Sequence, residues 1–221
     1  MADSTAPDFW NERYQCEKTP WDFHGVPAAL TQFLDAAKPG RVLLPGCGSG
    51  YEIAAFLDAG WEAWGLDFSQ AAVRRARALL GTRADRVLFG DFFNYEFGQP
   101  FDLIYERTFL CALPPALWES YASRIKNLLI PGGRLAGFFF YGPEAAESPP
   151  YPLSRADAER LFPPGLELIE DQPAADSLPL FAGKERWQQW KKRSAGPPAP
   201  PSAERCPAGI VPPPSAQGPR I

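Results

Sequence analysis

Short apolar runs alternate with helical patterns along most of the chain. Five strands are predicted, at residues 41–44, 63–66, 87–89, 101–105 and 134–140. Amphipathic helices are predicted between them, at residues 52–59, 71–80 and 117–129. Strands that alternate with crossover helices build a parallel sheet covered on both faces, so the pattern predicts an α/β, doubly wound fold. Ligands of such folds bind beyond the carboxyl ends of the strands, where the winding reverses.

Local signals give the boundaries of these helices. Ser69 is the predicted N-cap of the second helix, and Gly60 ends the first. The third helix is closed by the Pro-Gly-Gly sequence at residues 131–133.

The two ends of the chain do not follow the α/β pattern. Residues 194–221 are about one third proline and contain no aromatic residue, so they are predicted to be disordered. The N-terminal part is rich in aromatic residues between residues 9 and 21. We therefore divide the chain into an aromatic N-terminal segment, residues 1–27, an α/β domain, residues 28–193, and a proline-rich tail, residues 194–221.

Composition narrows the class of protein. The 221 residues are 45% hydrophobic with a net charge of −4, and no long basic run is present, so nucleic acid is not an expected partner. Neither a signal peptide nor a stretch of about 20 apolar residues is evident, so we expect no membrane partner. We predict a cytoplasmic monomer that acts on a small molecule. Neither a metal site nor a disulfide framework is expected from four scattered cysteines, at positions 16, 47, 111 and 206.

A glycine-rich turn follows the first predicted strand, with glycine at positions 46, 48 and 50. Glycine allows a tight turn and a close approach of the backbone to a ligand, so Gly46 and Gly48 are predicted to contact a cofactor. The G-x-G-x-G spacing differs from the G-x-G-x-x-G of dinucleotide sites, which disfavours a nicotinamide cofactor. The alternative interpretation is that this glycine-rich segment is an ordinary turn of an α/β fold and binds no cofactor.

Acidic residues end the next two strands. Asp67 follows the second strand about twenty residues after the turn, where a carboxylate can accept both hydroxyls of a ribose. Its neighbour Phe68 is predicted to contact the same cofactor. Asp91 and Phe92 follow the third strand and can offer a carboxylate and an aromatic wall to an adenine ring.

The spacing of these motifs is that of class I methyltransferases, with Leu44 in place of the acid that many of them carry before the turn. The chain resembles the thiopurine S-methyltransferase-like family, in particular its plant-type halide, thiocyanate and thiol methyltransferases. The resemblance extends from residue 9 to residue 193. Besides the glycine turn it rests on residues 9–14 (FWNERY), 19–22 (TPWD), 90–93 (GDFF), 108–113 (TFLCAL), 131–133 (PGG), 149–153 (PPYPL) and 183–186 (GKER).

This resemblance implies an S-adenosyl-L-methionine-dependent methyltransferase with a mostly parallel seven-stranded sheet. It also implies that N-terminal aromatic residues fold over the cofactor, here Trp10, Tyr14 and Trp21, with Tyr14 where plant members often have tryptophan. Trp10 and Tyr14 share a helical face, and Pro20 is predicted to stop that helix before Trp21. A helix that merely packs on the core is the alternative.

Arg107 follows the fourth strand, where the resemblance to bacterial thiopurine-type members implies a cofactor contact. An arginine there can bind the methionine carboxylate or an anionic substrate. The alternative is a structural ion pair with Glu106 or Asp102. The only histidine, His24, is predicted to be a polar loop residue.

The implied substrates are small soft nucleophiles: a thiol, hydrosulfide, thiocyanate or a halide. Thiolates, thiocyanate and halides need no general base at the moment of attack, which fits a sequence without an evident Cys/His or His/Asp constellation. Two alternatives remain, a larger thiopurine-like substrate and a binding protein without turnover. The predicted substrate pocket is aromatic, with Tyr141 preferred as a catalytic residue beside Arg107. Its other candidates are Phe138, Phe139, Phe140 and Tyr151.

Overall fold

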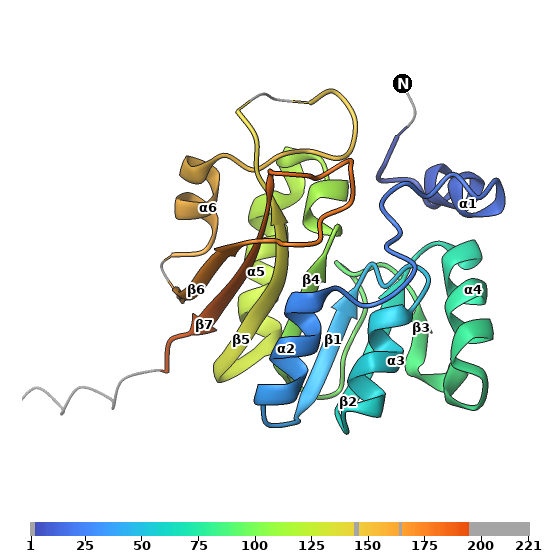
Figure 1. The fold of residues 1–221 in the computed structure, drawn as a ribbon, viewed down its shortest axis with the longest axis horizontal. Helices are drawn as coiled ribbons and strands as arrows, with labels where there is room; N and C mark the ends of the chain where they lie inside the picture. Colours follow the sequence, from blue (N-terminus) through green and yellow to red (C-terminus); the bar gives the residue numbers. More distant parts are fainter. Residues whose placement is uncertain (1–2, 144–145, 164, 195–221) are drawn as a thin grey trace, which may run out of the picture.

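The computed structural model describes residues 3–143, 146–163 and 165–194 (Figure 1). The predicted disorder of residues 194–221 falls, except for Ser194, outside the described residues.

A seven-stranded sheet in the order β3-β2-β1-β4-β5-β7-β6 forms the centre of the domain. Its strands are β1 (Arg41–Pro45), β2 (Glu62–Asp67), β3 (Val87–Phe89), β4 (Phe101–Arg107), β5 (Leu129–Phe140), β6 (Leu166–Pro173) and β7 (Glu185–Lys192). The pairs among β1 to β5 are parallel, whereas β7 runs antiparallel to both β5 and β6. The prediction of a mostly parallel seven-stranded sheet is therefore confirmed. From β1 the chain moves outward to β3 and then returns to the other side with β4.

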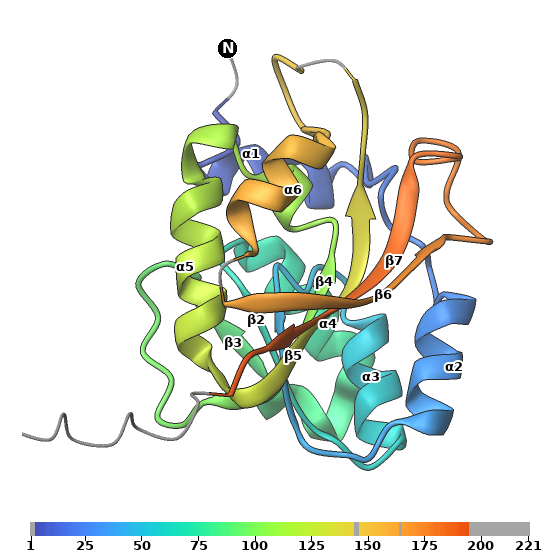
Figure 2. The ribbon, with the colours of Figure 1, turned by 90° about the vertical axis from the view of Figure 1, so that its left-hand side faces the viewer.

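Helices pack on both faces of this sheet (Figure 2). The α-helices are α1 (Pro7–Gln15), α2 (Ala28–Ala36), α3 (Tyr51–Asp58), α4 (Gln70–Leu80), α5 (Trp118–Leu128) and α6 (Arg155–Leu161). Side chains of α2, α3 and α4 share one buried cluster with Val42 and Leu44, and those of α5 and α6 share a second with Leu43. Because successive side chains of a strand point to opposite faces, β1 contributes to both clusters.

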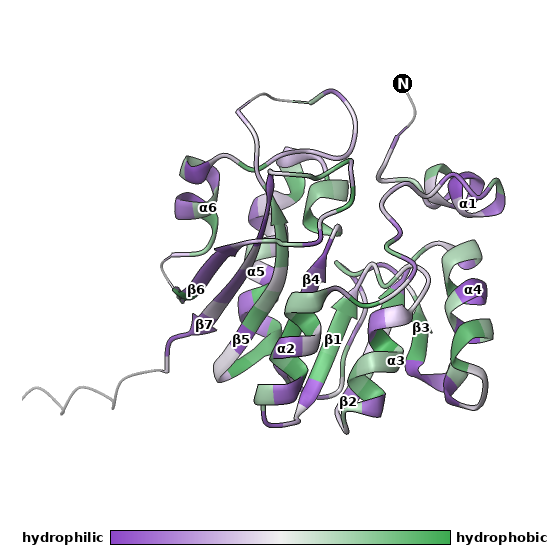
Figure 3. Cartoon of the chain, in the orientation of Figure 1, coloured by the Kyte–Doolittle hydropathy of each residue, from purple (hydrophilic) through white to green (hydrophobic). Residues whose placement is uncertain are grey.

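The last two strands were missed by the apolar pattern. Figure 3 shows the central strands largely green, hence hydrophobic, and β6 and β7 largely purple. In β7 the buried positions include Gln188 and Gln189, whose side chains bond to other polar side chains. A buried strand of this kind satisfies its polar groups internally, so it does not have the apolar run of β1.

The predicted helix caps are partly confirmed. Ser69 caps α4, and its Oγ accepts a hydrogen bond from the Ala72 amide at 3.2 Å. Gly60 follows α3 with a φ of 83°, the left-handed conformation of a helix end. The third helix, α5, ends at Leu128, and the Pro-Gly-Gly sequence at residues 131–133 lies inside β5.

Candidate functional site

A cavity of about 1300 Å³ opens at the carboxyl ends of β1, β2 and β4. It lies on the edge of the sheet where the fold class predicted a ligand. Every residue predicted to contact a cofactor lines this cavity. They are Trp10, Tyr14, Trp21, Gly46, Gly48, Asp67, Phe68, Asp91, Phe92 and Arg107.

The glycine turn between β1 and α3 faces this cavity. Gly46 and Gly48 have φ values of 59° and 52°, which side-chain-bearing residues rarely adopt. A Cβ on Gly46 would lie 2.4 Å from Cδ2 of Phe109, and one on Gly48 would lie 2.6 Å from Oη of Tyr14. Glycine is therefore required at both positions for the turn to fit beneath these rings.

Asp67 ends β2 and connects the glycine turn to α4. Its Oδ2 accepts a hydrogen bond from the Gly48 amide at 3.0 Å, and its Oδ1 accepts one from the Ser69 amide at 2.8 Å. Burial raises the pKa of Asp67 to about 6, against the opposing effect of these amides. A carboxylate oxygen can accept more than one hydrogen bond, so Asp67 retains acceptor capacity.

Asp91 and Phe92 form the wall of the cavity after β3. The Asp91 side chain bonds within its own loop, with Oδ1 accepting from the Phe93 amide at 3.0 Å and Oδ2 from Asn94 Nδ2 at 2.5 Å. Phe92 is buried, and its ring centroid lies 5.2 Å from that of Phe109. The loop is thus held in place while both residues still line the cavity.

The N-terminal aromatic residues form one cluster at the cavity. The Trp21 ring meets those of Trp10 and Tyr14 nearly at right angles, at centroid distances of 5.4 and 6.1 Å. Its Nε1 donates a hydrogen bond to Tyr14 Oη at 3.4 Å. Trp10 and Tyr14 lie on α1 as predicted, but this helix ends at Gln15, well before Pro20. Burial raises the pKa of Tyr14, so the phenol is neutral at ordinary pH.

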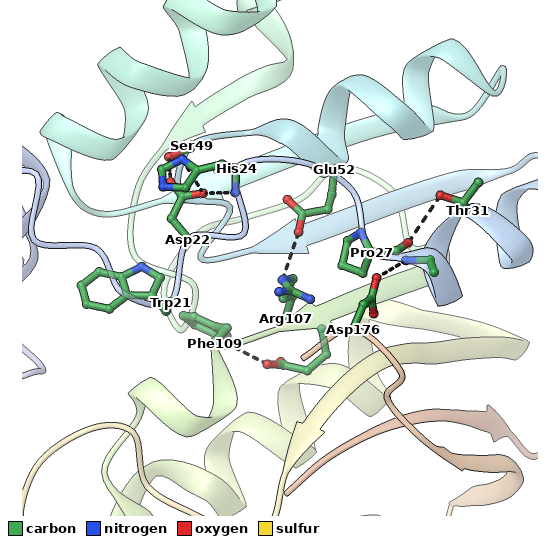
Figure 4. Close-up of polar contacts among 12 residues, drawn as sticks. Trp21, Asp22, His24, Pro27, Thr31, Ser49, Glu52, Arg107, Phe109 and Asp176 are labelled. Atoms are coloured by element: carbon green, nitrogen blue, oxygen red, sulfur yellow. Dashed lines mark hydrogen bonds and ion pairs between the residues drawn. The ribbon is translucent and has the colours of Figure 1, made fainter. Parts of the chain in front are cut away.

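Two polar side chains attach this segment to the domain. Oδ1 of Asn11 accepts hydrogen bonds from Ser69 Oγ at 2.8 Å and from the Ala71 amide at 3.1 Å. Farther along, Ser49 Oγ donates to Asp22 Oδ2 at 2.5 Å (Figure 4). Neither contact can be identified from the sequence, because the partners of Asn11 and Asp22 lie 58–60 and 27 positions away in the chain.

Arg107 lies at the end of β4, with only 8% of its side chain exposed. Its guanidinium carbon is 4.9 Å from the ring centroids of both Phe23 and Phe138. Its Nε lies 3.3 Å from Oε1 of Glu52, an ion pair drawn in Figure 4. The buried Nη2 has no hydrogen-bond partner among the described residues. Arg107 is therefore a fixed cation whose donors are not all used by the protein.

The two ion-pair partners suggested for Arg107 by the sequence are wrong. Asp102 Oδ2 accepts a hydrogen bond from the Arg41 amide instead, at 2.8 Å. Glu106 points to the loop after β4, where Oε1 accepts from the amides of Phe109 and Leu110 and Oε2 accepts from Tyr121 Oη at 2.6 Å. Burial raises the pKa of Glu106 to about 7. The true partner, Glu52, comes from α3, where a polar position in an amphipathic helix looks solvent-exposed in the sequence.

The predicted aromatic substrate residues lie elsewhere. Tyr141 does not line the cavity, and its Oη donates to Gln188 Oε1 at 3.0 Å beside β7. The other candidates, Phe138, Phe139, Phe140 and Tyr151, do not line it either. Phe138 and Phe139 belong to the core, where Phe138 packs on Trp187 and Phe139 packs on Phe162. The cavity lining includes instead Phe23, which packs on Arg107, and Cys111, Pro149, Pro150 and Phe181.

Other sequence-based expectations concern single residues and absences. His24 lies in an exposed loop with a φ of 54°, and its ring is 6.3 Å from that of Tyr51. In the described ranges, three or more metal-ligating side chains are nowhere gathered in one place. Each helix in that part of the chain is too short or too polar to cross a membrane.

The strand order, with one antiparallel strand beyond β5, and the glycine turn after β1 define the fold of class I methyltransferases. Among solved structures, the chain is similar in fold to Burkholderia thailandensis 1,6-didemethyltoxoflavin-N1-methyltransferase, determined with S-adenosylhomocysteine. The TM-score is 0.70 at 19% sequence identity, over 85% of this chain and 87% of that chain.

The chain belongs to the thiopurine S-methyltransferase family, whose model matches residues 5–193. It is 33% identical over 192 residues to "Probable thiol methyltransferase 2" of Arabidopsis thaliana, covering 84% of this chain and 85% of that protein. It is 28% identical over 190 residues to "Thiocyanate methyltransferase 1" of the same plant, covering 83% and 84%. The predicted class, an S-adenosylmethionine-dependent methyltransferase, is confirmed at the level of family and fold.

Proposed function

We propose that the protein transfers a methyl group from S-adenosylmethionine to a small soft nucleophile: a thiol, hydrosulfide, thiocyanate or a halide. The names of two relatives, a thiol and a thiocyanate methyltransferase, support this substrate class. The observation that carries it is Arg107, a buried cation at the cavity wall with an unpartnered Nη2. A fixed guanidinium in a site of low dielectric attracts an anion far more strongly than one in water.

The residues at the ends of β1, β2 and β3 fit the cofactor. Side chains at Gly46 and Gly48 would clash with Phe109 and Tyr14, so the turn requires glycine there. Without a Cβ, the backbone of the turn can also come close to the cofactor. We assign Asp67 to the ribose hydroxyls, with Phe68 beside it, and Asp91 and Phe92 to the adenine ring. When bound, the cofactor supplies a methyl group already activated by its sulfonium charge.

The N-terminal segment, residues 1–27, serves in this proposal as a lid. Trp10, Tyr14 and Trp21 line the cavity, and an aromatic face within reach of a cationic sulfonium attracts it by about 0.5–2 kcal/mol. The hydrogen bonds of Asn11 and Asp22 hold the lid to the domain. A closed lid excludes water from the reacting atoms.

In this proposal Arg107 holds the nucleophile. Phe23 and Phe138 fix the plane of its guanidinium, and Glu52 occupies its Nε. The remaining donors can orient one small anion toward the cofactor side of the cavity. Because methyl transfer needs only alignment and water exclusion, such positioning accounts for most of the catalysis expected of the protein.

A substrate panel tests this proposal. The purified protein is incubated with S-adenosylmethionine and, in turn, iodide, thiocyanate, hydrosulfide and 6-mercaptopurine, and the methylated products are quantified. We expect kcat/KM for the best small nucleophile to exceed that for the purine by at least about tenfold. A preference for the purine contradicts the substrate class. Cofactor binding without any methylated product contradicts enzymatic turnover.

A further inference from the structure

The ion pair between Arg107 and Glu52 is part of a larger group of buried polar side chains. Glu52 belongs to α3, Tyr105 and Arg107 to β4, and Glu185 to β7. The first three line the cavity, whereas Glu185 does not. Two buried carboxyl groups therefore accompany one arginine, and only one of them reaches the site.

Glu52 is placed to meet a ligand at Arg107. One carboxylate oxygen faces Arg107 Nε at 3.3 Å, and Figure 4 shows the other oxygen directed away from the guanidinium. Its side chain is 14% exposed and lines the cavity. An anion or a thiol at Arg107 would therefore share this guanidinium with Glu52.

The surroundings of Glu52 favour its protonated form and so make it a better proton acceptor than an exposed glutamate. Burial raises its pKa, Arg107 opposes that rise, and Asp22 of the N-terminal segment adds to it. The other titratable neighbours are Cys47 and Tyr105, and burial raises the pKa of both, so they stay neutral near pH 7. Glu52 is thus a carboxylate beside the guanidinium whose affinity for a proton is raised by burial.

The proposed substrates differ in whether they carry a proton. The thiol of cysteine has a pKa of about 8.5, and a simple alkyl thiol such as ethanethiol is a weaker acid, so near pH 7 it is almost entirely neutral and weakly nucleophilic. Iodide and thiocyanate are anions that have no proton to lose. A thiol therefore needs a proton acceptor in the site, and the other two substrates do not.

We propose that Glu52 accepts the proton of a thiol substrate bound at Arg107, which rests on the function proposed above. The S–H bond breaks, its electron pair stays on sulfur, and the proton forms an O–H bond on the Glu52 carboxylate. The thiolate, held by Arg107, then forms a bond to the methyl carbon as the bond from that carbon to the cofactor sulfur breaks. That bond's electron pair stays on the cofactor sulfur. Glu52 afterwards returns its proton to water.

Other carboxylates near the cavity are already engaged. Asp22 accepts a hydrogen bond from Ser49, and Glu106 accepts three bonds around the loop after β4. Glu185 lies beside the same arginine but outside the cavity lining. It therefore provides a matched control for the charge of the cluster.

The test compares Glu52→Gln with Glu185→Gln, each assayed with ethanethiol and with thiocyanate. The amide keeps the size of the side chain and an acceptor for Arg107, so folding is expected to survive. In Glu52→Gln we expect the ratio of kcat/KM for ethanethiol to that for thiocyanate to fall about 100-fold. In Glu185→Gln this ratio stays within about twofold of the wild-type ratio. Equal losses for both substrates in Glu52→Gln, or an unchanged ratio, overturn the proposal.

The pH profile gives a second readout. For the wild type, kcat/KM with ethanethiol rises with pH as Glu52 loses its proton, above the usual range of a glutamate. In Glu52→Gln the rise in kcat/KM occurs at higher pH, closer to the pKa of the thiol itself. The pH profile with thiocyanate does not shift in this way. A thiol profile identical in both proteins contradicts a role for Glu52 as proton acceptor. Lack of turnover of every substrate by the wild type would instead reject the proposed function.

Discussion

The two sides of the cavity are built in different ways. The side proposed for the cofactor is made of residues at or just after the ends of β1, β2 and β3, such as Gly46, Asp67 and Asp91. The side around Arg107 gathers Phe23 and Glu52 from distant parts of the chain, and Phe138 packs on the guanidinium from outside the cavity lining. The first side depends on backbone geometry at strand ends, which short motifs specify. The second depends on tertiary packing, which no local motif specifies.

The polar contacts differ in the same way. Asp67 is held by two backbone amides, whereas Arg107 is held by one buried carboxylate and two rings. Backbone donors keep their positions when side chains change, but an ion pair is lost when either partner is replaced. We therefore expect substitutions on the first side to change cofactor affinity alone. Substitutions on the second side should change the KM for the substrate and disturb the side chains that contact Arg107.

Asp67→Ala is the change with the largest expected effect. It removes the proposed partner of the ribose hydroxyls, and hydrogen bonds to a charged group contribute about 1.5–3 kcal/mol. We expect the Kd for S-adenosylhomocysteine, measured by calorimetry, to rise about 10- to 100-fold. Asp58→Ala, at an exposed pair with Arg83, is the matched control and leaves the Kd unchanged. An unchanged Kd in Asp67→Ala contradicts the cofactor assignment.

Arg107→Gln tests the second side. We expect the KM for thiocyanate to rise at least about tenfold, because the fixed positive charge is lost. The replacement leaves Glu52 buried without its cation, so the double variant Glu52→Gln/Arg107→Gln restores neutrality as a check on folding. If both variants are folded and keep the wild-type KM, then Arg107 does not bind the substrate.

Asn11→Ala tests the attachment of the lid. Its side chain accepts two hydrogen bonds from the N-terminal end of α4, next to Asp67. Loss of a cap of this kind costs about 1 kcal/mol, so we expect cofactor affinity to fall about fivefold. The tryptophan fluorescence change on adding S-adenosylhomocysteine should shrink in parallel. Glu12→Ala, one position further on α1, serves as the control, and equal losses in both variants would contradict a specific role for Asn11.

Glu106→Gln has the smallest expected effect on binding and turnover, because Glu106 does not line the cavity, and it changes stability alone. Burial raises the pKa of Glu106 to about 7, whereas a glutamate in an unfolded chain titrates near 4.3. The unfolded chain therefore loses this proton first, and the contribution of Glu106 to the free energy of unfolding falls as pH rises from about 4.5 to 7. The slope is at most about 1.4 kcal/mol per pH unit. Urea denaturation should show that the wild type loses stability relative to Glu106→Gln over this range, and parallel curves would contradict it.

The sequence predicted the parts of the fold that apolar residues specify. The runs of β1 to β5 and the cap at Ser69 are read directly from neighbouring residues. The strands β6 and β7 were missed because paired glutamines, lysines and acids replace an apolar run there.

The same division holds for the site. The glycine turn and Asp67 could be placed from their positions after strands, but the partner of Arg107 could not, because Glu52 lies 55 positions earlier, on α3. Tyr141 was expected at the cavity from the order of residues after β5. The antiparallel pairing of β7 with β5 instead brings Gln188 to its hydroxyl.

The affinity of Arg107→Gln for S-adenosylhomocysteine is the most direct test of the division between the two sides. An arginine at this position can serve either the carboxylate of the cofactor or an anionic substrate. We predict that calorimetry gives this variant a Kd within about twofold of the wild-type value, while its KM for thiocyanate rises. A loss of cofactor affinity as large as that of Asp67→Ala would place Arg107 on the cofactor and contradict the proposed division.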